Sequence, residues 1–432
     1  MSNFIQVDYN PFEEENTSRY FDTTEEQREI YTSIKIGGEN ASLAYNECVS
    51  LRLSGNCNLQ ALADACKKTI ERHASLRSIF TEDGMQFSFA DNVTTSIKIV
   101  DLKNLQSTDF NNQFDAIIST EVQTPFNLQS GNVVRFHIIL QSPTETILVI
   151  TAHHIVCDGW SIGIIMQDIS KFYSAAIDNK KPELEKLNSF EDYIHHQQNR
   201  KANGDHSRTE KFWFDLFASH TPVVDMPVDN PRPAIRTFNA ARADVTIPEE
   251  TAKGIKQFGA KCGSSYVNTL FAAFEVFLNK ITRQTDLVVG LPAAGQSASG
   301  MYQLVGHCVN ILPIKTTIDE KITFADYLKQ RRNAMFDALD NQEFTMGSLL
   351  ARLPLQRDPG RIPLVPVVFN VDLGLTTGVE FKGLTYKFES YPRKFENFEM
   401  FVNATGMGDA LNFECTYNTD LFNADVIQLR LQ

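Results

Sequence analysis

The sequence of 432 residues has no apolar run long enough to span a membrane. Residues 1–16 are polar and acidic, so they do not have the pattern of a signal peptide. The formal net charge is −13, which makes nucleic acids and anionic membrane surfaces poor partners. We therefore expect a protein of the cytoplasm that binds neither nucleic acid nor membrane.

Cysteine and histidine are scarce and are not arranged as metal ligands. The seven cysteines are odd in number and scattered, which predicts reduced, buried thiols. There is no Cys-x-x-Cys pair and no His-Glu-x-x-His motif among the nine histidines. The sequence therefore predicts no metal centre.

The composition is that of a globular protein with large cores, at 42% hydrophobic and 22% charged residues. The length suggests two or three domains. The polar run 178–183 contains a proline and is the clearest boundary, so we predict two domains, 1–179 and 180–432.

Helical and strand patterns alternate in both halves, which favours the α/β (α+β) class. Asn58 is predicted to cap a helix that begins at Leu59. The periodic stretches predict further helices at 162–176 and 266–281, and strands at 133–140, 147–151, 286–291 and 365–371.

The most informative stretch is His153-His154-Ile-Val-Cys-Asp158-Gly159-Trp160-Ser161. It lies between a predicted strand and a predicted helix, where a turn can hold a polar side chain rigidly at the end of a sheet. Neighbouring strand residues point to opposite faces, so one histidine should face a cavity and the other the interior. Catalysis by one histidine is the favoured interpretation. A metal site and a purely structural histidine pair are the alternatives.

The two histidines, three spacers and Asp-Gly resemble the signature of the chloramphenicol-acetyltransferase-like acyl transferases, and Trp160-Ser161 resembles the condensation domains of nonribosomal peptide synthetases. Further blocks of that family occur in family order along nearly the whole chain. They are 72–80 (RHASLRSIF), 125–135 (from PFNL to Arg135), 190–193 (FEDY), 305–310 (VGHCVN), 341–343 (NQE) and 357–364 (RDPGRIPL). Ala74 and Thr345-Met346 depart from the family pattern, away from the expected centre.

The resemblance implies two acetyltransferase-like subdomains in a V-shaped pseudo-dimer with a central tunnel. A floor loop near 285–306 and a latch near 362–385 would cross from the C-terminal subdomain to the N-terminal one. The chain would then be a piece of a larger assembly line. It would work beside an adenylation domain and between upstream and downstream carrier proteins, which present their substrates on phosphopantetheine. No cofactor bound by this domain itself is expected.

The implied reaction is attack of a carrier-bound aminoacyl amine on an upstream carrier-bound acyl or peptidyl thioester, which forms an amide. His154 would face the tunnel as general base or as the group that positions the amine, and the resemblance leaves both roles open. His153 looks structural, and the Gly159 amide would approach the thioester. Asp158 is expected to hold the loop through an ion pair with Arg77. The tunnel would be lined by Trp160, Ser161 and Asn310.

Particular residues distinguish a condensation domain from related domains with other functions. An epimerization domain shares the two histidines but differs in the other blocks, and a heterocyclization domain replaces His153 by Asp. A stand-alone acyl transferase that uses coenzyme A would lack the carrier-facing blocks, and an inactive recruitment domain usually loses the motif. Carrier docking would use local basic patches, for which the candidates are Lys329, Arg331 and Arg332.

Overall fold

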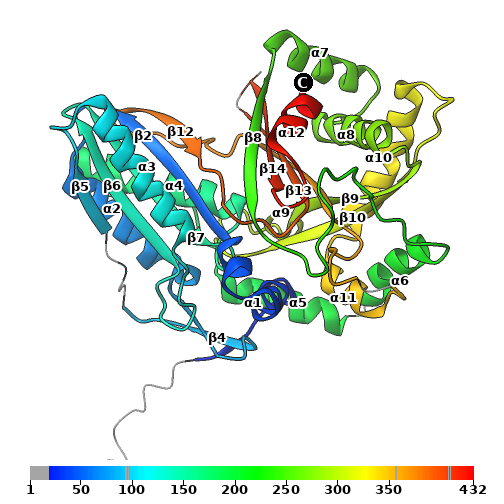
Figure 1. Ribbon diagram of the computed structural model, residues 1–432. Coiled ribbons are helices and arrows are strands. Elements are labelled where there is room, and N and C mark those ends of the chain that lie inside the picture. Colours follow the sequence, from blue (N-terminus) through cyan, green and yellow to red (C-terminus); the bar gives the residue numbers. More distant parts are fainter. Residues whose placement is uncertain are drawn as a thin grey trace, which may run out of the picture.

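The computed structural model describes residues 19–92, 95, 97–203, 205–355, 358–406, 408 and 410–432. These residues form two lobes, each with its own sheet and core, arranged as a V (Figure 1). The mixed helix-and-sheet class predicted from the sequence is confirmed. None of the described helices is long and apolar enough to cross a membrane.

The N-terminal lobe is built on a five-stranded sheet. Its order is β12 (Thr385–Ser390), β2 (Asn46–Ser54), β7 (Glu145–His153), β6 (Val134–Ser142) and β5 (Ile97–Asp101). Only β5 and β6 are parallel. Both faces of β7 are covered, which explains its almost continuous apolar run. The strands predicted at 133–140 and 147–151 are confirmed as β6 and β7.

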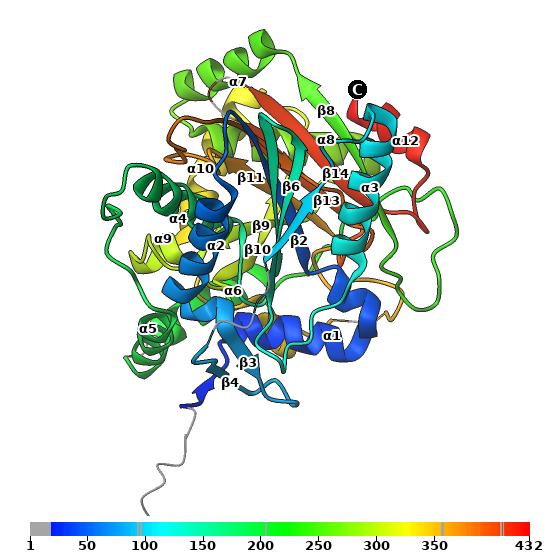
Figure 2. The same ribbon diagram turned by 90° about the vertical axis from the view of Figure 1, so that its left-hand side faces the viewer.

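Helices cover both faces of this sheet, as Figure 2 shows for α2 and α3. On one face α2 (Leu59–Arg72) packs beside α4 (Gly159–Ile177), and α3 (Ser107–Gln123) covers the other. The predicted cap is confirmed, because the Asn58 side chain accepts the Ala61 N–H. The 3–4 spacing of Ile162, Ile165 and Ile169 places them in the core. The remaining elements are α1 (Glu25–Leu43), the 3-10 turn η1 (Ala74–Arg77) and the small sheet β1 (Phe21–Asp22), β4 (Gln86–Phe89) and β3 (Ser78–Phe80).

The C-terminal lobe is built on a six-stranded sheet. Its order is β10 (Val309–Thr317), β9 (Asp286–Ala294), β11 (Val367–Leu373), β13 (Met400–Gly406), β14 (Leu411–Asn418) and β8 (Ala240–Ile247). Its helices are α6 (Asp205–Phe217), α7 (Glu249–Lys261), α8 (Tyr266–Thr282), α10 (Phe324–Asp340), α11 (Met346–Arg352) and α12 (Ala424–Leu431). The helix α5 (Phe190–Ala202) instead packs its buried face on the core of the N-terminal lobe. The predicted helix 266–281 and the two predicted strands are confirmed as α8, β9 and β11.

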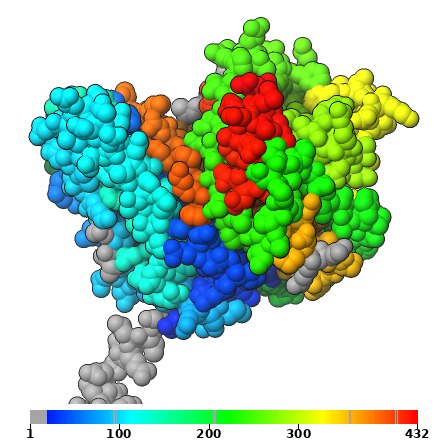
Figure 3. All heavy atoms as spheres, in the orientation of Figure 1, coloured from blue at the N-terminus to red at the C-terminus, as the bar shows by residue number. Residues whose placement is uncertain are grey.

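The chain crosses from the second lobe to the first at 295–308 and at 374–391, and each crossing overlaps one of the segments predicted to cross but ends beyond it. The first crossing, 295–308, contains α9 (Gly295–Ser299), and its Leu304, Val305 and Cys308 belong to the N-terminal core. The second crossing, 374–391, carries β12 to the edge strand β2 (Figure 3, orange). Residues 286–294 and 367–373 are instead strands of the C-terminal sheet, so the crossings are offset from the predicted boundaries. The division of the chain at 179 stays a prediction.

Candidate active site

The two adjacent histidines lie where β7 leaves the sheet, and they point to opposite sides as predicted. The His153 N–H donates to the Val133 carbonyl and the His154 N–H to the Tyr45 carbonyl. The His153 side chain is fully buried, whereas that of His154 is half-buried and lines a large cavity. The alternation of the strand therefore separates an interior histidine from one that substrates can reach.

His153 is held in the interior as a neutral group. Its Nδ1 accepts the Ile155 N–H at 3.2 Å, and the Phe126 ring stands edge-on to the imidazole at 6.0 Å. Burial, with a smaller contribution from His154, lowers the pKa of His153 to about 3. The structural role expected for this uncharged, buried ring stays a prediction.

Asp158 is the N-cap of α4 and is fully buried. Its carboxylate accepts the Ser161 N–H at 2.9 Å, the Ser161 hydroxyl at 2.7 Å, the Gln296 amide at 2.9 Å and the Cys308 N–H at 3.1 Å. Two of these four donors belong to the crossing segment 295–308. Asp158 therefore ties the turn to the floor of the cavity, and the positive end of the α4 dipole lies beside its charge.

The predicted ion pair between Asp158 and Arg77 is wrong. The Arg77 guanidinium donates to the carbonyls of Ile70, Glu71 and Ala90, at the end of α2 and beside β4. Backbone and amide donors satisfy the Asp158 carboxylate, so it needs no cation.

The tunnel-lining positions expected for Ser161 and Asn310 are also not seen. Ser161 is fully buried, and its hydroxyl joins Asp158 to the Gly306 backbone. The Asn310 amide, on β10, donates to the carbonyls of Gln342 and Phe344. Both side chains are engaged in hydrogen bonds to segments that are distant in the sequence, which a sequence motif does not reveal. Trp160 does line the cavity, and its indole N–H donates to the Tyr302 carbonyl at 3.1 Å.

Sequence reasoning assigned no role to His307, which the crossing segment brings against His154. The two Nδ1 atoms are 3.2 Å apart, so one ring donates and the other accepts. Burial lowers the pKa of both groups, with the Arg393 charge adding to the effect on His154 and the His154 charge to that on His307. The pair is therefore neutral at pH 7, and His154 can accept a proton.

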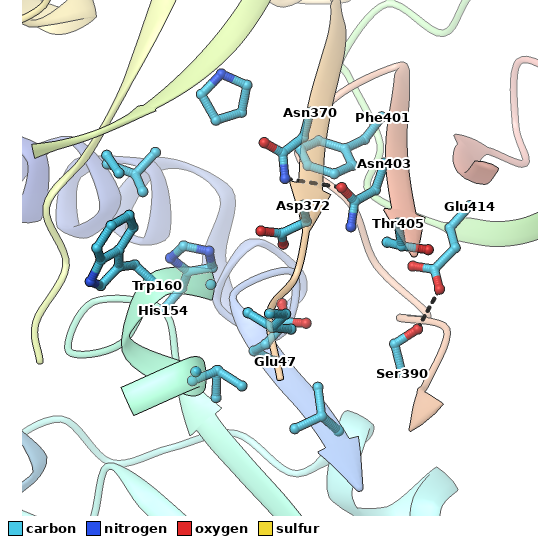
Figure 4. Close-up of a pocket in the computed structure, with 18 of the residues that line it drawn as sticks. Glu47, His154, Trp160, Asn370, Asp372, Ser390, Phe401, Asn403, Thr405 and Glu414 are labelled. Carbon is cyan, nitrogen blue, oxygen red and sulfur yellow. Dashed lines mark hydrogen bonds between the residues drawn. The ribbon is translucent and has the colours of Figure 1, made fainter. Parts of the chain in front are cut away.

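The cavity has a volume of about 1730 Å³ and lies between the two lobes. Single small-molecule sites usually measure about 300–1,000 Å³, so this space can hold two long substrates. The wall that belongs to the first lobe carries His154 and Trp160 (Figure 4). Gly159 also lines the cavity on this lobe. Asn370 and Asp372 of β11 face this wall from the second lobe.

Gly159 permits a close approach between these walls. A Cβ at this position would lie 3.1 Å from Asp372 Oδ2, so a side chain would have to displace the carboxylate. Elsewhere on the cavity, Glu47 pairs with Arg393, and Glu414 accepts the Ser390 hydroxyl at 2.7 Å.

Within the described residues, no three His, Cys, Asp or Glu side chains are placed to hold a metal ion.

The three residues predicted for carrier docking differ in exposure. Arg331 is unsuited to carrier docking, because it is buried and forms a two-point ion pair with Glu275 at 2.8 and 2.9 Å. Lys329 remains exposed beside Asp326, and the Arg332 guanidinium donates to the Gly263 carbonyl at 3.4 Å.

Known proteins resemble this chain along almost its whole length. The family model described as the condensation domain matches residues 22–432. Surfactin synthase subunit 1 of Bacillus subtilis (strain 168) is 27% identical over 423 residues, which are 97% of this chain and 11% of that protein. Bacitracin synthase 2 of Bacillus licheniformis is 27% identical over 399 residues, 90% of this chain and 14% of that protein.

Two solved structures share the fold. The condensation domain from Monacolin K polyketide synthase MokA superimposes with a TM-score of 0.84 at 15% identity, covering 96% of this chain and 95% of that one. The first condensation domain of the calcium-dependent antibiotic synthetase gives 0.81 at 16% identity, covering 95% and 94%. The chain thus spans only 11% and 14% of the two synthetases but nearly the whole of these structures.

Proposed function

The chain belongs to the condensation domain family, and from that premise we propose that it joins two carrier-bound substrates through an amide bond. In this reaction the amine of an aminoacyl thioester attacks the carbonyl carbon of an upstream acyl or peptidyl thioester. The new C–N bond forms, the C–S bond breaks, and the nitrogen loses a proton while the sulfur leaves as a thiol. The protein is then an acyltransferase of a peptide assembly line.

The observation that carries this proposal is the position of His154 on a cavity between two lobes. Its Nδ1 is engaged with His307, so the remaining ring nitrogen is the one left for a substrate. The lowered pKa keeps the ring neutral at pH 7, as a proton acceptor requires. We assign His154 to the acceptor amine, as base or as positioning group. His153, Asp158 and Gly159 hold the turn that presents it.

The size of the cavity supports the proposal that both substrates arrive on flexible phosphopantetheine arms. A thioester on phosphopantetheine is long and thin, and two such groups must meet at one point. The cavity is larger than a single-ligand site and is lined from both lobes. We propose that one carrier protein supplies each substrate, that an adenylation domain of the same cytoplasmic assembly line loads the acceptor carrier, and that the domain holds no cofactor of its own.

The rival function is a stand-alone acyl transferase that uses free coenzyme A thioesters. A tethered arm gives its substrate an effective concentration of about millimolar, so specific contacts can be few. The test compares an aminoacyl-carrier acceptor with the same aminoacyl group on a short soluble thiol, at equal micromolar concentration, with the product identified by mass spectrometry. We expect amide mainly from the carrier-bound acceptor. Equal rates would contradict carrier dependence and support the rival.

A further inference from the structure

One carboxylate on the cavity wall differs from the other acids around it. Asp372 lies near the end of β11, where the strand alternates: Phe369 packs against Phe271 and Phe274 of α8, whereas Asn370 and Asp372 face the cavity. Its oxygens stand against Gly159 at the start of α4. The positive end of that helix favours an anion at this place.

Most of the neighbouring acids of the cavity already have partners. Glu47 and Glu396 pair with Arg393, Glu389 pairs with Lys387 and Arg52, and Glu414 accepts from Ser390 and lies near Arg242. Glu26 accepts from Gln197, and Glu29 accepts the Gly347 N–H. Glu380 is exposed at the rim. Among the residues that the structure describes, none bonds to or pairs with the Asp372 carboxylate. Because this half-buried carboxylate lines the cavity and has no partner there, it is available to bind a cationic ligand.

The reaction brings one cation to this cavity. The donor thioester is neutral at its reacting carbon, whereas an α-amino group with a pKa of about 7.7–8.0 arrives largely as an ammonium ion at pH 7. An ammonium ion is not a nucleophile, so it must lose a proton before it can attack. Asp372 and His154 both point into the same space, from opposite lobes (Figure 4).

We propose that Asp372 binds the α-ammonium group of the acceptor substrate and accepts its proton, on the wall opposite His154. This inference rests on the proposed condensation activity. The ammonium ion and the carboxylate become a free amine and a carboxylic acid, and the amine attacks the donor thioester. As the amide forms and the C–S bond breaks, the second nitrogen proton passes to His154 and then to the leaving thiolate. Asp372 returns its proton to the water that enters the cavity.

The electrostatic surroundings suit this task. Burial raises the pKa of Asp372 to about 6, and nearby acids add to the shift. The charged and titratable groups around it are Glu47 and Arg393, Glu414 and Arg242, Asp158, and His154. Between pH 6 and 8 the carboxylate is therefore ionised while the amine is still protonated, so the two attract each other. Above about pH 8 the amine is free and needs no carboxylate.

The experiment measures acceptor kcat/KM against pH for the wild-type chain and for Asp372→Asn, with both carriers preloaded. Hydrogen bonds to charged groups contribute about 1.5–3 kcal/mol, so we expect a roughly 10- to 100-fold loss at pH 7. At pH 9 the variant should come within about threefold of wild type, because the amine is already neutral. The matched control is Glu380→Gln, an acid-to-amide change at the exposed rim of the same cavity. It should change the rate little and equally at every pH.

Each outcome has a separate meaning. If the wild-type chain forms no amide, the proposed function fails. If it forms amide but Asp372→Asn loses nothing, or loses the same factor at pH 7 and pH 9, only the assignment of Asp372 is overturned. A binding measurement provides a second readout. Asp372→Asn should weaken binding of a non-reacting aminoacyl carrier, and it should not affect a carrier whose acyl group lacks the amine. Equal weakening of both would also contradict the assignment.

Discussion

The two walls of the cavity are built on different principles. On the first lobe, the turn 153–161 is held by short bonds that leave the buried Asp158 carboxylate fully satisfied. On the second lobe, β11 presents a carboxylate at Asp372 with no partner among the described residues. On the first wall the Asp158 carboxylate holds the turn together, and the neutral imidazole of His154 faces the cavity. On the second wall the Asp372 carboxylate is available to the substrate. Residue type alone therefore does not tell a structural acid from a functional one, whereas the donors around it do.

The largest effect should come from the first wall. His154→Ala should lower the single-turnover rate of amide formation by about 10²–10⁴-fold, the usual loss for a positioned acid–base group. The fold should be intact, because the ring faces the cavity. Rapid quench with preloaded carriers measures the rate, and the melting temperature is the control. A rate within a few-fold of wild type would leave His154 without a catalytic role.

Asp158→Ala should act through stability. The Ser161, Gln296 and Cys308 donors would lose their acceptor, and each unsatisfied buried group costs about 1–3 kcal/mol. We expect a free energy of unfolding lower by several kcal/mol, together with lower activity. Denaturant titration measures the free energy of unfolding. An inactive variant that unfolds at the wild-type denaturant concentration would show that Asp158 acts directly on the substrate.

The buried His153 should make the fold sensitive to acid. Its pKa is near 6.5 when unfolded and about 3 when folded, so the unfolded chain binds more protons between these values. The stability that the neutral His153 side chain contributes to the fold is fully present above about pH 6.5 and is lost as the pH falls towards 3. His153→Gln should flatten the fall of unfolding free energy over this range. An unchanged slope would assign the acid sensitivity to other groups.

The smallest effects distinguish the observed partner of Asp158 from the predicted one. Changes at Asp158 and Gln296 should be coupled by about 0.5–3 kcal/mol of unfolding free energy, because the two side chains touch. Changes at Asp158 and Arg77 share no partner and should add to within about 0.5 kcal/mol. Two double-mutant cycles measure these coupling free energies. Coupling between Asp158 and Arg77, with additivity between Asp158 and Gln296, would support the predicted ion pair instead.

Local patterns predicted the elements around the site well. The 3–4 spacing that begins at Ile162 and the apolar run that begins at Ile147 depend only on near neighbours, and both are confirmed as α4 and β7. The opposite orientations of His153 and His154 followed from strand alternation alone.

Contacts between distant segments could not be predicted in the same way. Gln296 and Cys308 reach Asp158 across 138 and 150 residues, and no local pattern records such a pairing. The same holds for His307 beside His154 and for Asp372 opposite Gly159. His307 is one of only nine histidines and lies in a recognisable block, which was the one available signal.

Both walls of the cavity are expected to act on one amine, and a double-mutant cycle tests this central claim directly. Single-turnover rates of amide formation at pH 7 are compared for wild type, His154→Ala, Asp372→Asn and the double variant, with both carriers preloaded. Groups that serve one substrate atom should couple, so we predict that the two losses fall short of additivity by about tenfold or more. Losses that multiply to within about threefold would mean that the walls act independently and would contradict the claim.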